Sequence, residues 1–83
     1  MWQAQGFFLD NKGQMWVWGD TKRHHMFFDS AKEAVDYCVE INKSMGNKPL
    51  DVILCANNDP LFSKFKTFVR RELPSPRYEW VEK

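Results

Sequence analysis

The chain has 83 residues, with 12 Lys and Arg against 11 Asp and Glu and a net charge of +1. This length predicts one compact domain over residues 1–83, without room for separate cofactor and substrate domains. No apolar run reaches the roughly 18 residues of a membrane span, and no signal-peptide pattern is present. The small net charge provides no long-range field toward nucleic acid or an anionic membrane. Two cysteines are too few for a disulfide scaffold, so we expect a reducing, cytoplasmic location.

The first 28 residues predict three short strands. We expect strands at 2–9, 14–19 and 24–28, because these segments are rich in aromatic residues and are separated by turn signals. Residues 10–13, Asp-Asn-Lys-Gly, suit a tight hairpin, since Asp or Asn opens a turn and Gly supplies a left-handed conformation. The pattern predicts a three-stranded antiparallel meander.

The clearest predicted element is an amphipathic helix over residues 29–45. Ser30 and Glu33 have the spacing of a capping box, and Gly46 stands where a left-handed residue often ends a helix. Apolar residues recur at steps of three and four along one face. They are Ala31, Ala34, Val35, Cys38, Ile41 and Met45.

The second half of the chain predicts a strand, a second helix and a last strand. Residues 51–56 form a short apolar run that is typical of a strand buried on both faces. Asn58-Asp59-Pro60 is typical of a helix start, because Asp59 can cap and Pro60 fits the first helical position. We therefore expect a helix over 61–72 and a final strand over 77–81. The expected apolar stripe of that helix is Leu61, Phe62, Phe65, Phe68, Val69 and Leu73.

These elements predict an α+β fold of two layers. The meander would be followed by an α-β-α unit, with both helices on one face of a mixed sheet. The connection from strand 24–28 through helix 29–45 to strand 51–56 is long enough for a parallel crossover.

The predicted strands carry too many aromatic side chains for a sheet with one wet face. Trp16 and Trp18 would point away from Met15 and Val17, so a face not covered by helices would carry a strip of large aromatics, with Phe27 on the third strand. Such a patch often marks a partner site, and it is also compatible with a homodimer. The alternative is a second small core, covered by the C-terminal segment with Tyr78 and Trp80.

Basic residues predict two further binding surfaces. Lys22 and Arg23 stand at a predicted hairpin tip next to His24 and His25. Four more bases would share the polar side of the predicted helix over 61–72, where they could meet phosphates or an acidic protein, although a solvated face is the more ordinary explanation. These four are Lys64, Lys66, Arg70 and Arg71.

The sequence offers little catalytic chemistry. Cys38 and Cys55 are expected to be core residues, and adjacent His24 and His25 would face opposite ways on a strand, so no metal site is predicted. No glycine-rich phosphate loop and no paired nucleophile and base are evident. We therefore expect no cofactor and no enzymatic activity.

Residues 28–34, Phe-Asp-Ser-Ala-Lys-Glu-Ala, follow three predicted strands and open a helix. This arrangement resembles the strand-strand-strand-helix unit of the arm-type DNA-binding domains of tyrosine recombinases, whose sheet enters the major groove. The present strands carry Trp16, Trp18 and Phe27, whereas those domains are usually basic along the sheet. The resemblance covers about half of the chain and identifies no family.

The function that these features favour is a small non-enzymatic protein-binding module. Small aromatic-rich proteins without catalytic groups are often encoded by phages and mobile elements as stoichiometric inhibitors of host or defence machinery, in the style of anti-CRISPR proteins. The alternative is a small nucleic-acid-binding protein that stacks bases on strand aromatics and holds the backbone with basic patches. A membrane partner is not expected.

Overall fold

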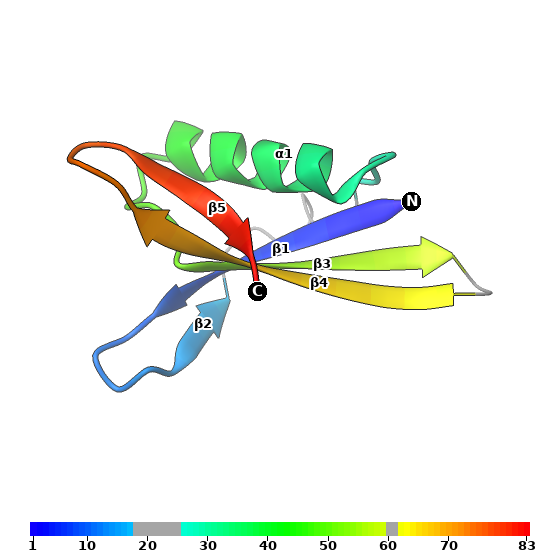
Figure 1. Ribbon diagram of the computed structural model, residues 1–83, viewed down its shortest axis with the longest axis horizontal. Coiled ribbons are helices and arrows are strands. Elements are labelled where there is room, and N and C mark those ends of the chain that lie inside the picture. Colours follow the sequence, from blue (N-terminus) through cyan, green and yellow to red (C-terminus); the bar gives the residue numbers. More distant parts are fainter. Residues whose placement is uncertain (18–25, 60–61) are drawn as a thin grey trace.

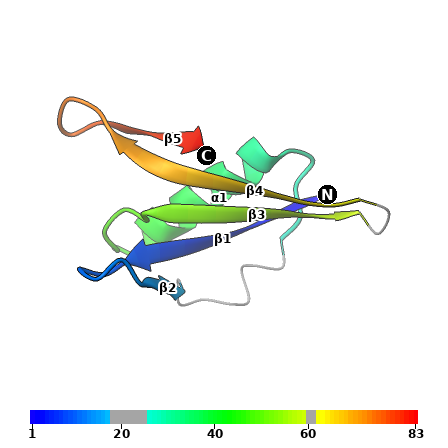
Figure 2. The same cartoon turned by 60° about the horizontal axis from the view of Figure 1, so that its bottom comes forward.

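The computed structural model describes residues 1–17, 26–59 and 62–83. Within these ranges five strands form one antiparallel sheet in the order β2-β1-β3-β4-β5, and one helix, α1 (Ala31–Ser44), lies on one face of it (Figure 1, Figure 2). The small α+β class is therefore confirmed. The strands are β1 (Trp2–Leu9), β2 (Met15–Val17), β3 (Val52–Asp59), β4 (Phe62–Glu72) and β5 (Tyr78–Glu82).

The hairpin between β1 and β2 forms where the sequence predicts it. The Asp10 carboxylate accepts hydrogen bonds from the backbone N–H groups of Lys12 and Gln14 at 2.9 and 2.8 Å. Gly13 has a φ of 80°, the left-handed conformation that the turn requires. Of the predicted second strand over 14–19, residues Met15–Val17 form β2, and residues 18 and 19 lie outside the described residues.

The predicted helix over 29–45 is also confirmed, with bounds Ala31–Ser44. The Ser30 side chain caps it by accepting a hydrogen bond from the Glu33 backbone N–H at 3.2 Å. Gly46 follows the helix with a φ of 74°. Most of the predicted apolar stripe faces the sheet and is buried, namely Ala31, Ala34, Val35 and Cys38, whereas Met45 at the C-terminal end is exposed.

The predicted second helix over 61–72 is wrong, because the segment forms β4, the longest strand of the sheet. It pairs with β3 from Val52↔Val69 to Asp59↔Phe62. The spacing of three and four residues between the apolar residues of this segment is that of a helical stripe, which explains the prediction. Their aromatic and β-branched side chains, however, favour the extended backbone that is observed. Asn58 and Asp59 consequently belong to the end of β3 and do not start a helix.

The predicted third strand over 24–28 is only partly described. Phe28 forms an isolated antiparallel bridge with Trp2, through backbone hydrogen bonds of 2.6 and 2.7 Å in the two directions. Because the Phe28 segment and β3 both run antiparallel to β1, they run parallel to each other, with β1 between them. The helix α1 therefore connects two segments that run parallel to each other. The predicted three-stranded meander and mixed sheet are replaced, in the described residues, by five antiparallel strands, with Phe28 bridged to β1.

The last predicted strand, over 77–81, is confirmed as β5. It pairs with β4 from Phe68↔Glu82 to Glu72↔Tyr78 and forms one edge of the sheet. Tyr78 and Trp80 therefore lie at this edge, on the face that carries α1. They do not cover the opposite face, as the prediction of a second small core required.

The core lies between α1 and the central strands β1 and β3. Ile53 and Cys55 are fully buried, and Leu50 is 1% exposed. Gly6 stands directly beneath this cluster, where a Cβ atom would lie 2.5 Å from Leu50 Cδ1 and 3.2 Å from Cys38 Sγ. The close approach of helix and sheet thus depends on the absence of a side chain at position 6.

Asp51 joins three segments at the start of β3. Its carboxylate accepts a hydrogen bond from the Leu9 backbone N–H at 2.7 Å and one from Arg70 Nη2 at 3.2 Å. Its own backbone N–H donates to the Phe7 carbonyl at 2.9 Å, and its carbonyl accepts from the Arg70 N–H at 3.2 Å. These bonds fix the ends of β1 and β4 on either side of β3.

In the described residues, no helix is long and apolar enough to cross a membrane.

The packing at Gly6 predicts a large effect of one methyl group. We expect Gly6→Ala to lower the free energy of unfolding by about 1–3 kcal/mol, because Leu50 is enclosed and must leave its position. Urea denaturation of the wild type and the variant measures the difference. In a Leu50→Ala background the same substitution should cost clearly less, since the two closest contacts are gone and the 3.2 Å approach to Cys38 Sγ is the one that remains. Equal costs in both backgrounds would contradict the account.

Candidate functional site

The face of the sheet opposite α1 is not covered by any element in the described ranges (Figure 1, Figure 2). Side chains alternate between the two faces along a strand, and cross-strand partners share a face. Gly6, Ile53 and Cys55 lie beneath the helix. The strand register therefore identifies the residues whose side chains lie on the opposite face. We call this surface the open face; it consists of Gln3, Gln5, Phe7, Leu9, Met15, Val17, Val52, Leu54, Ala56, Phe65, Thr67, Val69, Arg71, Glu79 and Val81.

The open face is predominantly apolar. Phe65 is 78% exposed, which is the highest value among the large hydrophobic residues that are described. Met15 and Val17 are about half exposed, whereas Val52 at the centre is buried by its neighbours within the sheet. A small monomer seldom exposes a contiguous apolar surface of this kind without a partner.

The open face carries no net charge among its described residues. Its charged members, Arg71 and Glu79, lie opposite each other on β4 and β5 and form an ion pair. Its other polar groups are neutral amides and a hydroxyl, at Gln3, Gln5 and Thr67. The surface therefore offers shape and apolar area to a partner rather than an electrostatic field.

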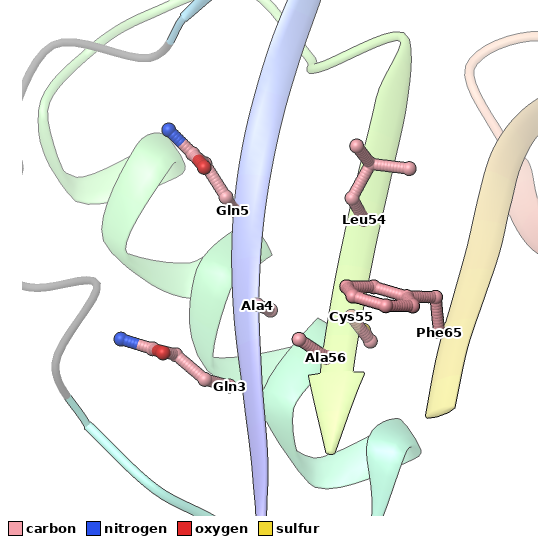
Figure 3. Close-up of a pocket in the computed structure, with 7 residues that line it drawn as sticks. All are labelled: Gln3, Ala4, Gln5, Leu54, Cys55, Ala56 and Phe65. Atoms are coloured by element: carbon pink, nitrogen blue, oxygen red, sulfur yellow. The ribbon is translucent and has the colours of Figure 1, made fainter. Parts of the chain in front are cut away.

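A hollow of about 220 Å³ lies on the open face over β1 and β3 (Figure 3). Phe65 projects from β4 beside Leu54 and Ala56, as Figure 3 shows. Ala56 pairs with Phe65 on one side and with Gln3 on the other. Because Ala56 is short and its neighbours are long, the surface is recessed at this point. The hollow is lined by Gln3, Ala4, Gln5, Leu54, Cys55, Ala56 and Phe65.

The aromatic residues predicted as binding anchors lie elsewhere or outside the described residues. Trp16 is paired with Phe8 and points away from the open face; it is 60% exposed, and its indole Nε1 donates to the Asp10 carboxylate at 3.0 Å. Phe27 is 46% exposed in the segment before α1. Trp18, together with the predicted hairpin-tip residues Lys22 and Arg23, lies outside the described residues.

The four bases predicted on one helix face are separated by the strand geometry of β4. Lys64, Lys66 and Arg70 share the face that carries α1, and Arg71 belongs to the open face. Three of the four form ion pairs: Lys66 with Glu82 at 3.4 Å, Arg70 with Asp51 at 3.2 Å and Glu72 at 3.1 Å, and Arg71 with Glu79. The expected four-base surface therefore does not form, because a strand has a period of two residues.

The sequence pattern does not predict the apolar residues of the open face as site residues. It predicts Phe65 and Val69 in the buried stripe of a helix, and Leu54 in a strand buried on both faces. The sequence contains a usable signal, since Phe65, Thr67, Val69 and Arg71 alternate with Lys64, Lys66, Phe68 and Arg70. A reading of period two over 64–71 would have placed Phe65 and Val69 on one sheet face.

The two cysteines are core residues, as predicted. Burial raises the pKa of Cys38 to about 12, with a smaller contribution from neighbouring Cys55. Burial also raises the pKa of Cys55 to about 11, while Lys66 acts in the opposite direction. Neither thiol is a nucleophile at neutral pH. Within the described part of the chain, no group of three or more His, Cys, Asp or Glu side chains could hold a metal ion.

Comparisons with known protein families, with curated proteins and with solved structures find no match to this chain.

The thiol environments predict slow alkylation of the folded protein. At pH 8 about one Cys55 side chain in a thousand and one Cys38 side chain in ten thousand is a thiolate, given pKa values of about 11 and about 12. We expect iodoacetamide to modify the native protein at least about a hundredfold more slowly than a free thiol. Mass spectrometry over time measures the rate, with urea-unfolded protein as the control. Rapid labelling of native Cys38 or Cys55 would show that the core is open.

The hairpin predicts a pH-dependent contribution to stability. The hydrogen bond from Trp16, followed by that from the Gln14 N–H, lowers the pKa of Asp10 below its usual value of 3.8. The carboxylate therefore stabilises the hairpin above about pH 4, and this contribution is lost as the pH falls through the lowered pKa. The Nε1–H resonance of Trp16, assigned with Trp16→Phe, should shift with a midpoint below 3.8. The shift should be absent in Asp10→Asn, and a midpoint at or above 3.8 would contradict the hydrogen bond.

Proposed function

We propose that the protein is a non-enzymatic protein-binding module that docks a partner through the open face. The observation that carries this proposal is a sheet of five strands with a helix on one face and, on the other, a predominantly apolar surface that no described element covers. The recessed surface at Ala56 and the projecting side chain of Phe65 give this surface the relief of a specific interface.

The chemistry of the open face defines the partner that fits. An apolar surface with one internal ion pair favours a partner surface that is also apolar and uncharged, because a buried unpaired charge would be costly. Phe65 supports the proposal as an anchor, since exposed aromatic side chains in an apolar patch are typical of interface hot spots.

The narrower prediction of a stoichiometric phage or mobile-element inhibitor is compatible with this mode of action. An inhibitor of this kind works by occupying a surface of its target, and it requires a binding face rather than a catalytic centre. The identity of the inhibited machinery is not part of the proposal.

Nucleic-acid binding is a less well supported alternative. Lys66, Arg70 and Arg71 are paired with acids, so fewer free cations remain for phosphates. The open face, although extended, has no unpaired cation among its described residues. Trp16 and Phe27 are exposed and could stack on bases, but they lie outside the open face.

A photo-crosslinking experiment tests the proposal. Phe65→benzoylphenylalanine places the reactive group on the open face beside the hollow, and Phe27→benzoylphenylalanine is a matched control at another exposed aromatic. After irradiation in cells that produce the protein, we expect nuclease-resistant protein adducts from position 65 and few or none from position 27.

Three results would overturn the proposal. Equal adducts from positions 65 and 27 would indicate non-specific contact. Adducts from position 65 that disappear with nuclease would indicate nucleic-acid binding. The absence of any adduct from position 65 would show that the open face has no partner.

A further inference from the structure

We propose that the partner of the open face is a second copy of this chain, which packs sheet against sheet around a two-fold axis close to Phe65. This inference rests on the proposed function, because it names the partner of the same surface. Its basis is that the open face carries a projecting side chain and a hollow that receives it.

Phe65 and the hollow are complementary in size. A cavity of roughly 150 Å³ can hold benzene in a protein interior, and the hollow on the open face has about 220 Å³. The ring of Phe65 has the dimensions of benzene and lines the hollow of its own copy from the side of β4 (Figure 3). The residue is 78% exposed, so its ring can also contact a second molecule. A partner that presents a ring in this position therefore fits, and a second copy presents one.

The placement of the two features on the same face fits a two-fold symmetric contact. In such an interface each patch meets its own equivalent, so a projection on one copy must meet a recess on the other. Phe65 and Ala56 are cross-strand neighbours, and the hollow lies over Ala56. A two-fold axis next to this pair inserts Phe65 of each copy into the hollow of the other and brings the two rings side by side.

The charges of the open face permit self-association. Arg71 and Glu79 neutralise each other, so two open faces meet without like charges at the centre. Arg71 lies about 20 Å from Phe65 along β4, at about 3.3 Å per residue. With the axis near Phe65, the ion pair therefore stays at the rim, where it keeps its hydration.

The area of the open face reaches the range of a specific interface. Four strands spaced about 4.8 Å apart and eight residues long at about 3.3 Å per residue give roughly 500 Å² in projection per copy. Two copies thus bury about 1,000 Å² in projection, near the lower limit of specific interfaces, and side-chain relief adds to this area. Two antiparallel sheets packed in this way form a sandwich about 10 Å apart.

Sedimentation equilibrium of the purified protein tests the proposal. We expect a concentration-dependent dimer for the wild type and for Phe27→Glu, and a monomer for Phe65→Glu. The informative variant is Ala56→Leu, which fills the hollow while it adds apolar area. If Phe65 enters the hollow of the second copy, Ala56→Leu should raise the dimer dissociation constant at least about tenfold.

A mixing experiment distinguishes loss of dimerisation from loss of folding in a single variant. Phe65→Glu and Phe65→Lys should each be monomeric, and their equimolar mixture should recover a heterodimer, because the axis places the two side chains next to each other. Circular dichroism checks that each variant retains the wild-type fold.

Two results would overturn the second-copy proposal. A wild type that stays monomeric up to about 1 mM has no significant self-affinity, and stronger association of Ala56→Leu would indicate non-specific apolar contact. In either case, crosslinking of position 65 to a different protein would leave the proposed function intact. If position 65 forms no adduct with any protein, the proposed function fails as well.

Discussion

The packing of α1 on β1 and β3 is the interaction on which the rest of the structure depends. Gly6 allows Leu50 and Cys38 to approach the sheet, and Ile53 and Cys55 complete a core that excludes water almost entirely. A helix of 14 residues covers the centre of a five-stranded sheet on one face only. The uncovered face is therefore a direct consequence of how the core is built, since the described residues include no second helix to lie on it.

Because the helix covers one face of the sheet, the chain has more apolar residues than its core contains. Ile53 and Cys55 alternate with Leu54 and Ala56 along β3, so one strand supplies side chains to both faces. The continuous apolar run over 51–56 predicts a strand buried on both faces; the strand is confirmed as β3, but only the face of Ile53 and Cys55 is buried beneath the helix. On the other side is the open face, which no element in the described ranges covers (Figure 1).

The sequence was sufficient for elements that depend on local chemistry. The hairpin after Leu9, the helix capped by Ser30 and ended near Gly46, and the final strand are determined by turn and capping residues that act over a few positions. The segment over 62–72 could not be assigned in the same way. Its aromatic spacing satisfied a helix, and the choice of strand depends on pairing with β3, a contact that no single segment reveals.

The helix predicted over 61–72 also determined where the sequence placed Phe65 and the four bases. As the predicted helix, residues 61–72 would bury Phe65 and place the four bases on one side. As the observed strand β4, the segment exposes Phe65 and distributes the bases over two faces. The sequence favours Trp16 as a site residue because a large aromatic on a predicted strand is conspicuous. It does not favour Phe65, because the exposure of Phe65 depends on where β4 lies within the sheet. No described element covers the face on which Phe65 lies.

The most direct measurement of the central claim is the accessibility of methyl groups to a dissolved paramagnetic probe, followed by NMR at low and high protein concentration. In dilute protein we expect the methyl signals of Leu54 and Val69 to be broadened strongly and those of Ile53 to be protected beneath α1. At high concentration the first two should become protected while Ile53 does not change. Protection of Leu54 and Val69 in the dilute monomer would show that the chain covers this face itself, and would contradict the account.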